Sequence, residues 1–274
     1  MHIVGELINS SRREVNEAIK VRNAGFIEDL AKRQANCGVN HIDVNAGVFL
    51  QEEPAILSWL VQTVQGVVDL PCTLDSPNPK AIEAALAVHR GQAMINSISL
   101  EQERYHALLP IVADSDLKVI ALCMSDGGMP STAEERLRIA EKLIDGLQQK
   151  NVPLYNIYVD PLVQPICTNN DFGVEFLNAV EQVMSQFHGV HTMCGMSNIS
   201  FGLPNRKLLN QTFMAMAITK GLDGAILNPL DEGMMSTIRA AEVLAGRDEF
   251  CMKYTNQFRA SNHWALNNYQ LRDR

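Results

Sequence analysis

The sequence predicts one closed barrel of eight parallel strands and surrounding helices, an α/β fold of the (β/α)8 TIM type. Eight short apolar or β-branched runs alternate with helix-length segments, and no linker or change of composition divides them. Neither a Gly-x-Gly-x-x-Gly turn nor a Gly-x-x-x-x-Gly-Lys-Ser/Thr loop is present, which disfavours an open nucleotide-binding sheet. We therefore predict one barrel over residues 1–247, followed by a C-terminal extension over residues 248–274.

The predicted strands are short runs rich in Val, Ile and other apolar residues, separated by turn-forming residues. Runs of this kind are typical of strands buried on both faces, as in a parallel barrel. In chain order they are 2–6, 41–44, 72–74, 93–95, 118–123, 156–159, 190–193 and 224–227.

The segments between the strands show helical periodicity, with apolar residues at steps of three and four. Ser131 and Glu134 have the spacing of a capping box, and Asn78 followed by Pro79 predicts a helix start. One apolar stripe is Leu57, Leu60, Val61, Val64, Val67 and Val68, and another is Leu137, Ala140, Leu143, Ile144 and Leu147. The glycines at predicted helix ends are Gly38, Gly91, Gly189 and Gly221.

The C-terminal extension mixes aromatic residues with Asn, Gln and Arg. Phe250, Tyr254 and Phe258 have helical spacing, and Trp264 and Tyr269 follow them. This pattern predicts an aromatic helix face that packs on the barrel exterior or forms a subunit contact.

Composition excludes several classes of function. The chain has 274 residues, 46% of them hydrophobic, and a formal net charge of -8. Basic residues form no run, so we expect no nucleic-acid partner. No window approaches the ~18 apolar residues of a membrane span, and the N-terminus lacks the pattern of a signal peptide. We expect a cytoplasmic protein that does not bind membranes.

Cysteine and histidine residues are interpreted as structural. The six cysteines are widely spaced and include no Cys-x-x-Cys pair, so we expect reduced thiols and no zinc-finger site. Cys194 is interpreted as a small buried hydrophobic residue rather than a nucleophile. Four histidines lie at predicted strand or helix ends and are expected to be surface or capping residues: His41, His89, His106 and His188.

Polar residues follow most of the predicted strands, where the site of a barrel enzyme is built. This set is rich in carboxylates and amides and poor in Lys, Arg and His. It suits a neutral ligand with N–H donors and ring nitrogens, such as an aminopyrimidinone edge, better than a phosphate. The residues in strand order are Glu6, Asp43, Asn45, Asp75, Asn96, Asp160, Gly195, Ser197 and Asn198.

Other interpretations of these residues stay open at this point. Asp43, Asp75 and Asp160 could bind a metal ion, although the interleaved amides and the lack of histidine favour an organic ligand. Asn45 fits a loop-stabilising role as well as a binding role. Asp75 and Asp160 end apolar strands, where an unpaired carboxylate is costly, so we assign them to function. Ser76 and Asn78 are interpreted as turn and cap residues.

These strand-end segments, taken in order, resemble the pterin-binding barrels that act as folate-dependent methyltransferases. The resemblance covers about residues 1–247 and is strongest to the methyltetrahydrofolate:corrinoid protein methyltransferases, including components of anaerobic O-demethylase and glycine-betaine systems. The folate domain of cobalamin-dependent methionine synthase is a more distant relative. The matching segments are GELIN at 5–9, DVN at 43–45, LDS at 74–76, MINS at 94–97, DPL at 160–162 and GMSNIS at 195–200.

The resemblance implies roles for individual residues. Asn198 would be the catalytic residue, facing the ring nitrogen that carries the methyl group. Arg206 would shape the pocket or meet the folate tail, or else form a structural salt bridge. Leu7 and Phe201 depart from the family pattern. The residues implied to bind the pterin are Asp75, Asn96, Asp160, Gly195, Ser197 and Asn198, with Glu6, Asp43, Asn45 and Arg206 as further substrate-binding residues.

The resemblance also implies the reaction and its partners. It predicts methyl transfer between a corrinoid protein and tetrahydrofolate or 5-methyltetrahydrofolate, by an enzyme that the resemblance implies is a homodimer. The chain has no room for a cobalamin domain, so the cobalamin is expected on a separate protein. Two alternatives are a dihydropteroate synthase-like enzyme and a non-catalytic folate-binding subunit. The first is disfavoured because residues 43–47 and 228–231 lack the synthase's Gly-Gly-Glu-Ser-Thr-Arg-Pro-Gly and Arg-x-His segments.

Overall fold

The computed structural model describes residues 1–260 and contains an eight-stranded parallel sheet in the order β7-β6-β5-β4-β3-β2-β1-β8. The main-chain N–H of Ile226 donates to Cys194 O at 2.9 Å, and Gly195 pairs with Ile226, so β8 also meets the end of β7 and the barrel closes. The strands are β1 His2–Asn9, β2 His41–Asn45, β3 Cys72–Asp75, β4 Met94–Leu100, β5 Lys118–Ser125, β6 Ile157–Asp160, β7 His191–Thr192 and β8 Gly224–Leu227.

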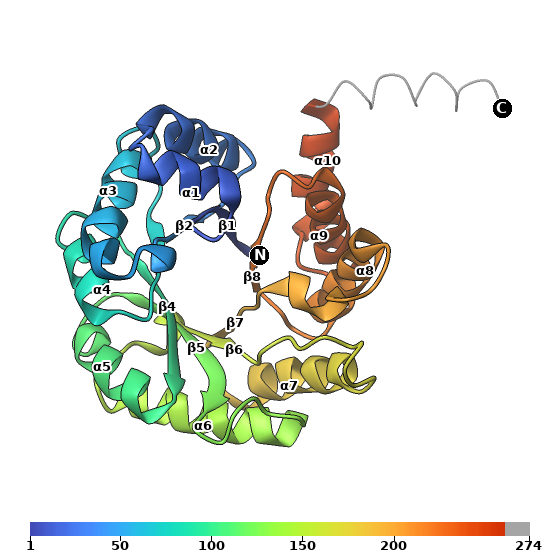
Figure 1. Cartoon of the computed structure of the whole chain (residues 1–274). Coiled ribbons are helices and arrows are strands. Elements are labelled where there is room, and N and C mark those ends of the chain that lie inside the picture. The colour runs from blue at the N-terminus through green and yellow to red at the C-terminus, as the bar shows by residue number, and fades with distance from the viewer. Residues whose placement is uncertain (261–274) are drawn as a thin grey trace, which may run out of the picture.

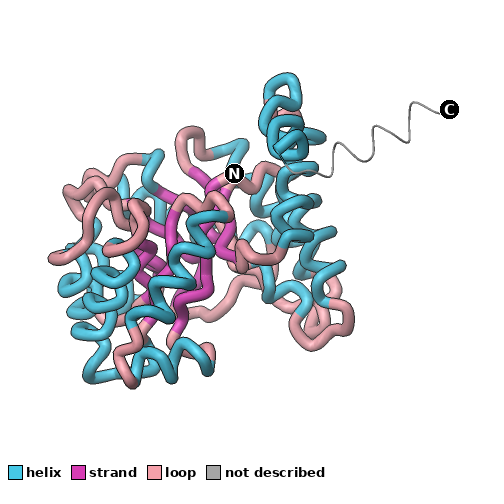
Figure 2. Tube along the Cα trace, turned by 90° about the horizontal axis from the view of Figure 1, so that it is seen from above, coloured by secondary structure: helices cyan, strands magenta, loops and turns pink. Residues whose placement is uncertain are grey.

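Helices surround the strands, as the views along and across the barrel show (Figures 1 and 2). The α-helices are α1 Arg13–Lys20, α2 Ala24–Asn36, α3 Glu53–Gln65, α4 Pro79–Leu86, α5 Gln102–Val112, α6 Ala133–Gln148, α7 Phe172–Gln186, α8 Arg206–Thr219, α9 Glu232–Leu244 and α10 Met252–Ala260. Short 3-10 helices are η1 Gly47–Glu52, η2 Leu154–Asn156, η3 Met196–Ser200 and η4 Glu249–Cys251.

The alternation of side chains along the strands explains the layout of the barrel interior. Successive residues point to opposite faces of a strand, so every second residue shares one face. Along β1, His2, Val4 and Glu6 follow one another on the same face, and along β6 Tyr158 and Asp160 do so. Apolar side chains therefore fill the middle, and polar side chains lie at both ends. The apolar cluster comprises Val4, Met94, Ile120, Tyr158 and Met193, with Ile226 packed against it.

The predicted elements are largely confirmed, with one shift at a helix start. All eight strands are present where the sequence predicts them, and Asn78 caps α4 by accepting from Lys80 N at 3.1 Å. The capping box of α6, however, is formed by Thr132 and Glu135 rather than by Ser131 and Glu134. Both pairs have the same three-residue spacing, so the sequence pattern alone does not distinguish the two helix starts.

The C-terminal extension differs from the predicted aromatic face. Phe250 lies in η4 with φ +52° and is 86% exposed, so it does not share a packed face of α10 with Tyr254. The side chain of Phe258, and all of Trp264 and Tyr269, lie outside the described residues. In the described part of the chain, none of the helices has the length and apolar character needed to cross a membrane.

Candidate active site

The ends of β2 and β3 bring Asn45 and Asp75 into contact. Asn45 Nδ2 donates to Asp75 Oδ2 at 2.9 Å and to Asp75 O at 3.1 Å. Asn45 Oδ1 in turn accepts from Ser10 Oγ at 2.8 Å and from Gly47 N at 3.1 Å. Both ends of the Asn45 amide are therefore engaged, and Asn45 both stabilises its loop and orients the Asp75 carboxylate. Burial raises the pKa of Asp75.

Asp43 is the least exposed of the four strand-end carboxylates Glu6, Asp43, Asp75 and Asp160. Its side chain is only 2% exposed, and it accepts from Asn96 Nδ2 at 3.3 Å. Burial, followed by the neighbouring carboxylate of Asp75, raises the pKa of Asp43 well above its ordinary value. This residue thus orients the Asn96 amide from below. Burial also raises the pKa of Glu6, which the charge of Arg12 partly opposes.

Asp160 ends β6 on the other side of the barrel mouth. Its Oδ1 accepts from Leu162 N at 2.8 Å, and its carboxylate also accepts from the main-chain N–H of Gly195. Burial raises its pKa from 3.8 to about 7, and these two hydrogen bonds and Arg136 oppose the rise. A carboxylate at this position can accept two parallel N–H bonds, as a 2-amino-pyrimidinone edge offers them.

The segment after β7 forms η3 and carries the predicted catalytic residue. Ser197 and Asn198 are exposed, and the Asn198 side chain makes no hydrogen bond among the described residues. Arg206 Nη2 donates to Ser197 O at 2.6 Å and Arg206 Nε donates to Ser200 Oγ at 3.0 Å. Arg206 therefore shapes this segment through hydrogen bonds. It forms no ion pair with the described residues, so the alternative prediction of a structural salt bridge is wrong for this part of the chain.

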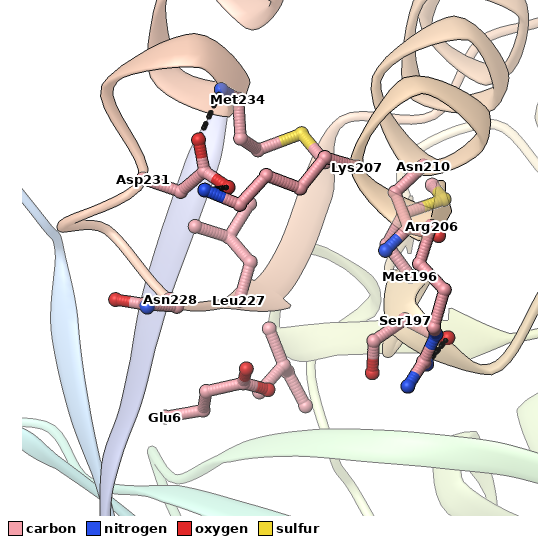
Figure 3. Close-up of a pocket in the computed structure, with 11 residues that line it drawn as sticks. Glu6, Met196, Ser197, Arg206, Lys207, Asn210, Leu227, Asn228, Asp231 and Met234 are labelled. Carbon is pink, nitrogen blue, oxygen red and sulfur yellow. Dashed lines mark hydrogen bonds and ion pairs between the residues drawn. The ribbon is translucent and has the colours of Figure 1, made fainter. Parts of the chain in front are cut away.

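A cavity of about 250 Å³ opens beside β8 and α8 and adjoins this segment (Figure 3). Glu6, Ser197 and Arg206 line it, whereas the other predicted site residues do not. Lys207 and Asp231 face each other across one side, with Lys207 Nζ 3.9 Å from Asp231 Oδ2 (Figure 3). The acidic residues of the barrel mouth thus lie next to a side pocket that contains both a positive and a negative side chain.

Two arginines of this region were missed by the sequence analysis. Arg104 Nε donates to Ser97 O at 2.7 Å, and its positive charge lowers the pKa of Asp75. Arg136 is fully buried beneath the loop that follows Asp160. A signal for Arg136 was present, because it lies four residues before Ala140 and so falls on the apolar stripe of α6.

The remaining cysteine and histidine predictions have mixed outcomes. Cys194 is fully buried, and burial raises the pKa of its thiol, as expected for a structural cysteine. His89 caps as predicted, since Cys72 N donates to its Nε2 at 2.9 Å. The expectation of a surface His41 is wrong: the ring is buried in the barrel end opposite the mouth, 2.9 Å from His2 Nε2. Residues 1–260 contain no group of three His, Cys, Asp or Glu side chains arranged to hold a metal ion.

The fold and the strand-end residues define a TIM barrel of the pterin-binding class. The chain belongs to the family of pterin binding enzymes, whose model matches residues 5–228. The fold agrees with that of a dihydropteroate synthase from Coxiella burnetii solved with pteroic acid. That comparison has a TM-score of 0.69 and 13% identity, and covers 89% of this chain and 93% of the other.

Sequence relatives include a methylcorrinoid:tetrahydrofolate methyltransferase and methionine synthases. A methylcorrinoid:tetrahydrofolate methyltransferase of Eubacterium limosum is 34% identical over 261 residues, which are 94% of this chain and 96% of the relative. Methionine synthase of Mycobacterium leprae is 29% identical over 239 residues, 82% of this chain. The chain spans 20% of that larger protein.

Proposed function

We propose that this protein transfers a methyl group between a corrinoid protein and tetrahydrofolate, in the direction methylcorrinoid to tetrahydrofolate. The observation that carries the proposal is the 34% identity, over 94% of this chain, to a methylcorrinoid:tetrahydrofolate methyltransferase. The strand-end carboxylates and amides support it, because their chemistry suits the amino and ring N–H groups of a pterin. The residues proposed to bind the pterin are Asp75, Asn96, Asp160, Gly195, Ser197 and Asn198, with Glu6, Asp43, Asn45 and Arg206 in supporting positions.

Asn198 is the proposed catalytic residue. In the transfer, N5 of tetrahydrofolate attacks the methyl carbon, the N–CH3 bond forms, the cobalt–carbon bond breaks with its electron pair left on cobalt, and N5 loses a proton. An exposed amide whose side chain makes no hydrogen bond to the described residues can orient N5 and stabilise its changing charge as a fixed dipole. In the reverse direction the same amide would assist the departure of the folate amine.

The corrinoid is proposed to arrive on a partner protein that docks over the barrel mouth. Exposed apolar side chains lie in the loops and the first helical turns that follow several strands, and Leu50 in η1 is 75% exposed. Leu50 also has φ +38°, a conformation that an L residue adopts only when its surroundings impose it. Exposed apolar groups around a site mark a contact surface. The apolar rim comprises Val48, Leu50, Met129, Val174, Phe201 and Leu208.

A homodimer formed through the end of α9 and the start of the C-terminal extension is also proposed. Leu244 and Phe250 are both highly exposed there, and an apolar patch of this kind is typical of a subunit contact. Comparing the sedimentation of the wild type with that of Leu244→Glu tests the dimer.

Because reduced folates oxidise readily, we place the reaction in the reducing cytoplasm.

The proposal is tested with tetrahydrofolate and free methylcobalamin under anaerobic conditions. Asn198→Ala should lower kcat at least 100-fold and change the Kd for tetrahydrofolate by less than about tenfold. Asn40→Ala, at the opposite end of the barrel, is the matched control and should preserve kcat. Wild-type protein that does not bind tetrahydrofolate at millimolar concentration would reject the folate site. Binding without methyl transfer by the wild type would indicate a non-catalytic folate-binding subunit.

A further inference from the structure

Arg136 is a fully buried cation whose hydrogen bonds go to main-chain carbonyl groups of two mouth loops. Its Nε donates to Pro161 O at 2.8 Å, its Nη1 to Thr132 O at 3.1 Å, and its Nη2 to Leu162 O at 3.5 Å. The side chain is 0% exposed. The arginine therefore connects the start of α6 with the loop that begins directly after Asp160.

The packing of α6 does not by itself require a cation at this position. The other buried residues of the helix are alanines, leucines and an isoleucine, and an apolar side chain would fill the same stripe. Burying a guanidinium is costly unless its donors are satisfied, so its presence here points to the groups that it holds. Here those groups are the carbonyl oxygens of the turn that presents Asp160.

That turn has a conformation that needs support. Leu162 has φ +66°, in the left-handed region that non-glycine residues rarely adopt. In this conformation its N–H donates to Asp160 Oδ1 at 2.8 Å, while its own carbonyl accepts from Arg136. The arginine and the carboxylate thus hold the same residue from its two ends. Gln164 Nε2, which donates to Pro130 O, ties the same two loops together further along.

We propose that Arg136 is a positioning residue for pterin recognition, which fixes the Pro161–Leu162 turn and so orients Asp160 toward the ligand, while placing a positive charge beside that carboxylate. The inference rests on the proposed function, since it takes Asp160 as a pterin ligand. Arg136 is buried away from the mouth and acts through Asp160 and not by touching the substrate.

The electrostatic part of this role follows from the groups that face Asp160. Arg136 from α6 is the positive charge among them, and Cys123 from β5 and Cys194 after β7 are thiols whose pKa values burial raises. The N–H groups of Leu162 and Gly195 complete the surroundings. Because the thiols stay neutral, removing the charge of Arg136 should favour the protonated form of Asp160 and move its titration to higher pH.

A double-mutant cycle on anaerobic tetrahydrofolate binding tests the proposal. The four proteins are the wild type, Arg136→Lys, Asp160→Asn and the double variant. Arg136→Lys keeps the charge but loses the planar fork of donors, and we expect about a tenfold rise in Kd. In the Asp160→Asn background the same change should raise Kd by less than about twofold. A purely structural role would give equal effects in both backgrounds.

A second variant and a stability control keep the test decisive. Arg136→Gln removes the charge and should move the pH midpoint of tetrahydrofolate binding upward, whereas Arg136→Lys should leave it near the wild-type value. Leu143→Ala, also fully buried on α6, controls for general destabilisation and should preserve both Kd and midpoint.

Each remaining outcome has a defined meaning. Folded Arg136 variants with wild-type Kd, or with equal losses in both backgrounds, would overturn the positioning role. So would Arg136 variants that fail to fold at low temperature while Leu143→Ala folds, because Arg136 would then serve the fold itself. If the wild type does not bind tetrahydrofolate, or Asp160→Asn binds it as tightly, the proposed pterin site fails instead.

Discussion

Replacing Asp160 by Asn should weaken ligand binding and at the same time stabilise the ligand-free protein at neutral pH. Both effects follow from one feature, a carboxylate that the fold buries at 8% exposure and that faces two main-chain N–H groups. In the proposed site, ionised Asp160 would accept strong hydrogen bonds from a pterin, but an ionised carboxylate is costly to bury. An amide keeps the shape and the acceptor oxygen, and it carries no charge.

The magnitude follows from the pKa of Asp160, which burial raises from 3.8 to about 7. A tenfold change in proton affinity is worth about 1.4 kcal/mol, so holding this group ionised at pH 8 costs the folded state up to about 4 kcal/mol. The Asn variant avoids this cost, but the hydrogen bonds from Leu162 and Gly195 to its side chain lose their charge-assisted strength, which offsets part of the stabilisation. We expect a net stabilisation of about 2 kcal/mol, or roughly 4–8 °C in Tm for a chain of this size.

The sign of the pH dependence identifies the cause. With a folded-state pKa above the unfolded-state value, the stabilising effect of the protonated form is fully present below pH 3.8 and is lost as pH rises through about 7. The Tm difference between Asp160→Asn and the wild type should therefore grow from pH 4 to pH 7 and then level off. Thermal unfolding of both proteins across this range measures it. A variant that is less stable than the wild type at pH 8, or a difference independent of pH, would refute the reasoning.

Three further predictions concern pH and packing. The Kd of the wild type for tetrahydrofolate should be about tenfold weaker at pH 6 than at pH 8, because Asp160 with a pKa of about 7 becomes protonated, and calorimetry on Asp160→Asn should show no such change. Burial lowers the pKa of His2 to about 3 and that of His41 to about 4, so each neutral ring contributes stability that is present above pH 6.5 and lost as pH falls. From pH 6.5 to 4.5 the free energy of unfolding should fall by about 2 kcal/mol per histidine, and in an acid titration His2→Gln should lose less of this free energy than the wild type. Gly5→Ala should cost about 1–3 kcal/mol in a denaturant titration, because its new methyl group would collide with Gln34 Oε1; Gly25→Ala, whose methyl group would meet only one atom, at an ordinary 3.6 Å, is the control.

The sequence by itself determined the class of fold and the ring of residues at the barrel mouth. Strand and helix periodicity are local properties, and eight alternations of strand and helix leave few architectures other than a barrel. The rule that strand C-termini converge then places Asp43, Asp75 and Asp160 at one end without any knowledge of contacts. For the same reason, the eight strands appear where they were predicted.

The tertiary structure alone decided which polar groups face one another. The bonds from Arg136 to Pro161 and Leu162 span 25 and 26 residues, and local periodicity carries no information about such pairs. His41 shows the same limit. A residue at a strand end can lie at the surface or inside the barrel, and only the closed sheet places His41 inside. Periodicity specifies the face on which a side chain lies, whereas its partners and its burial depend on segments that only folding brings together.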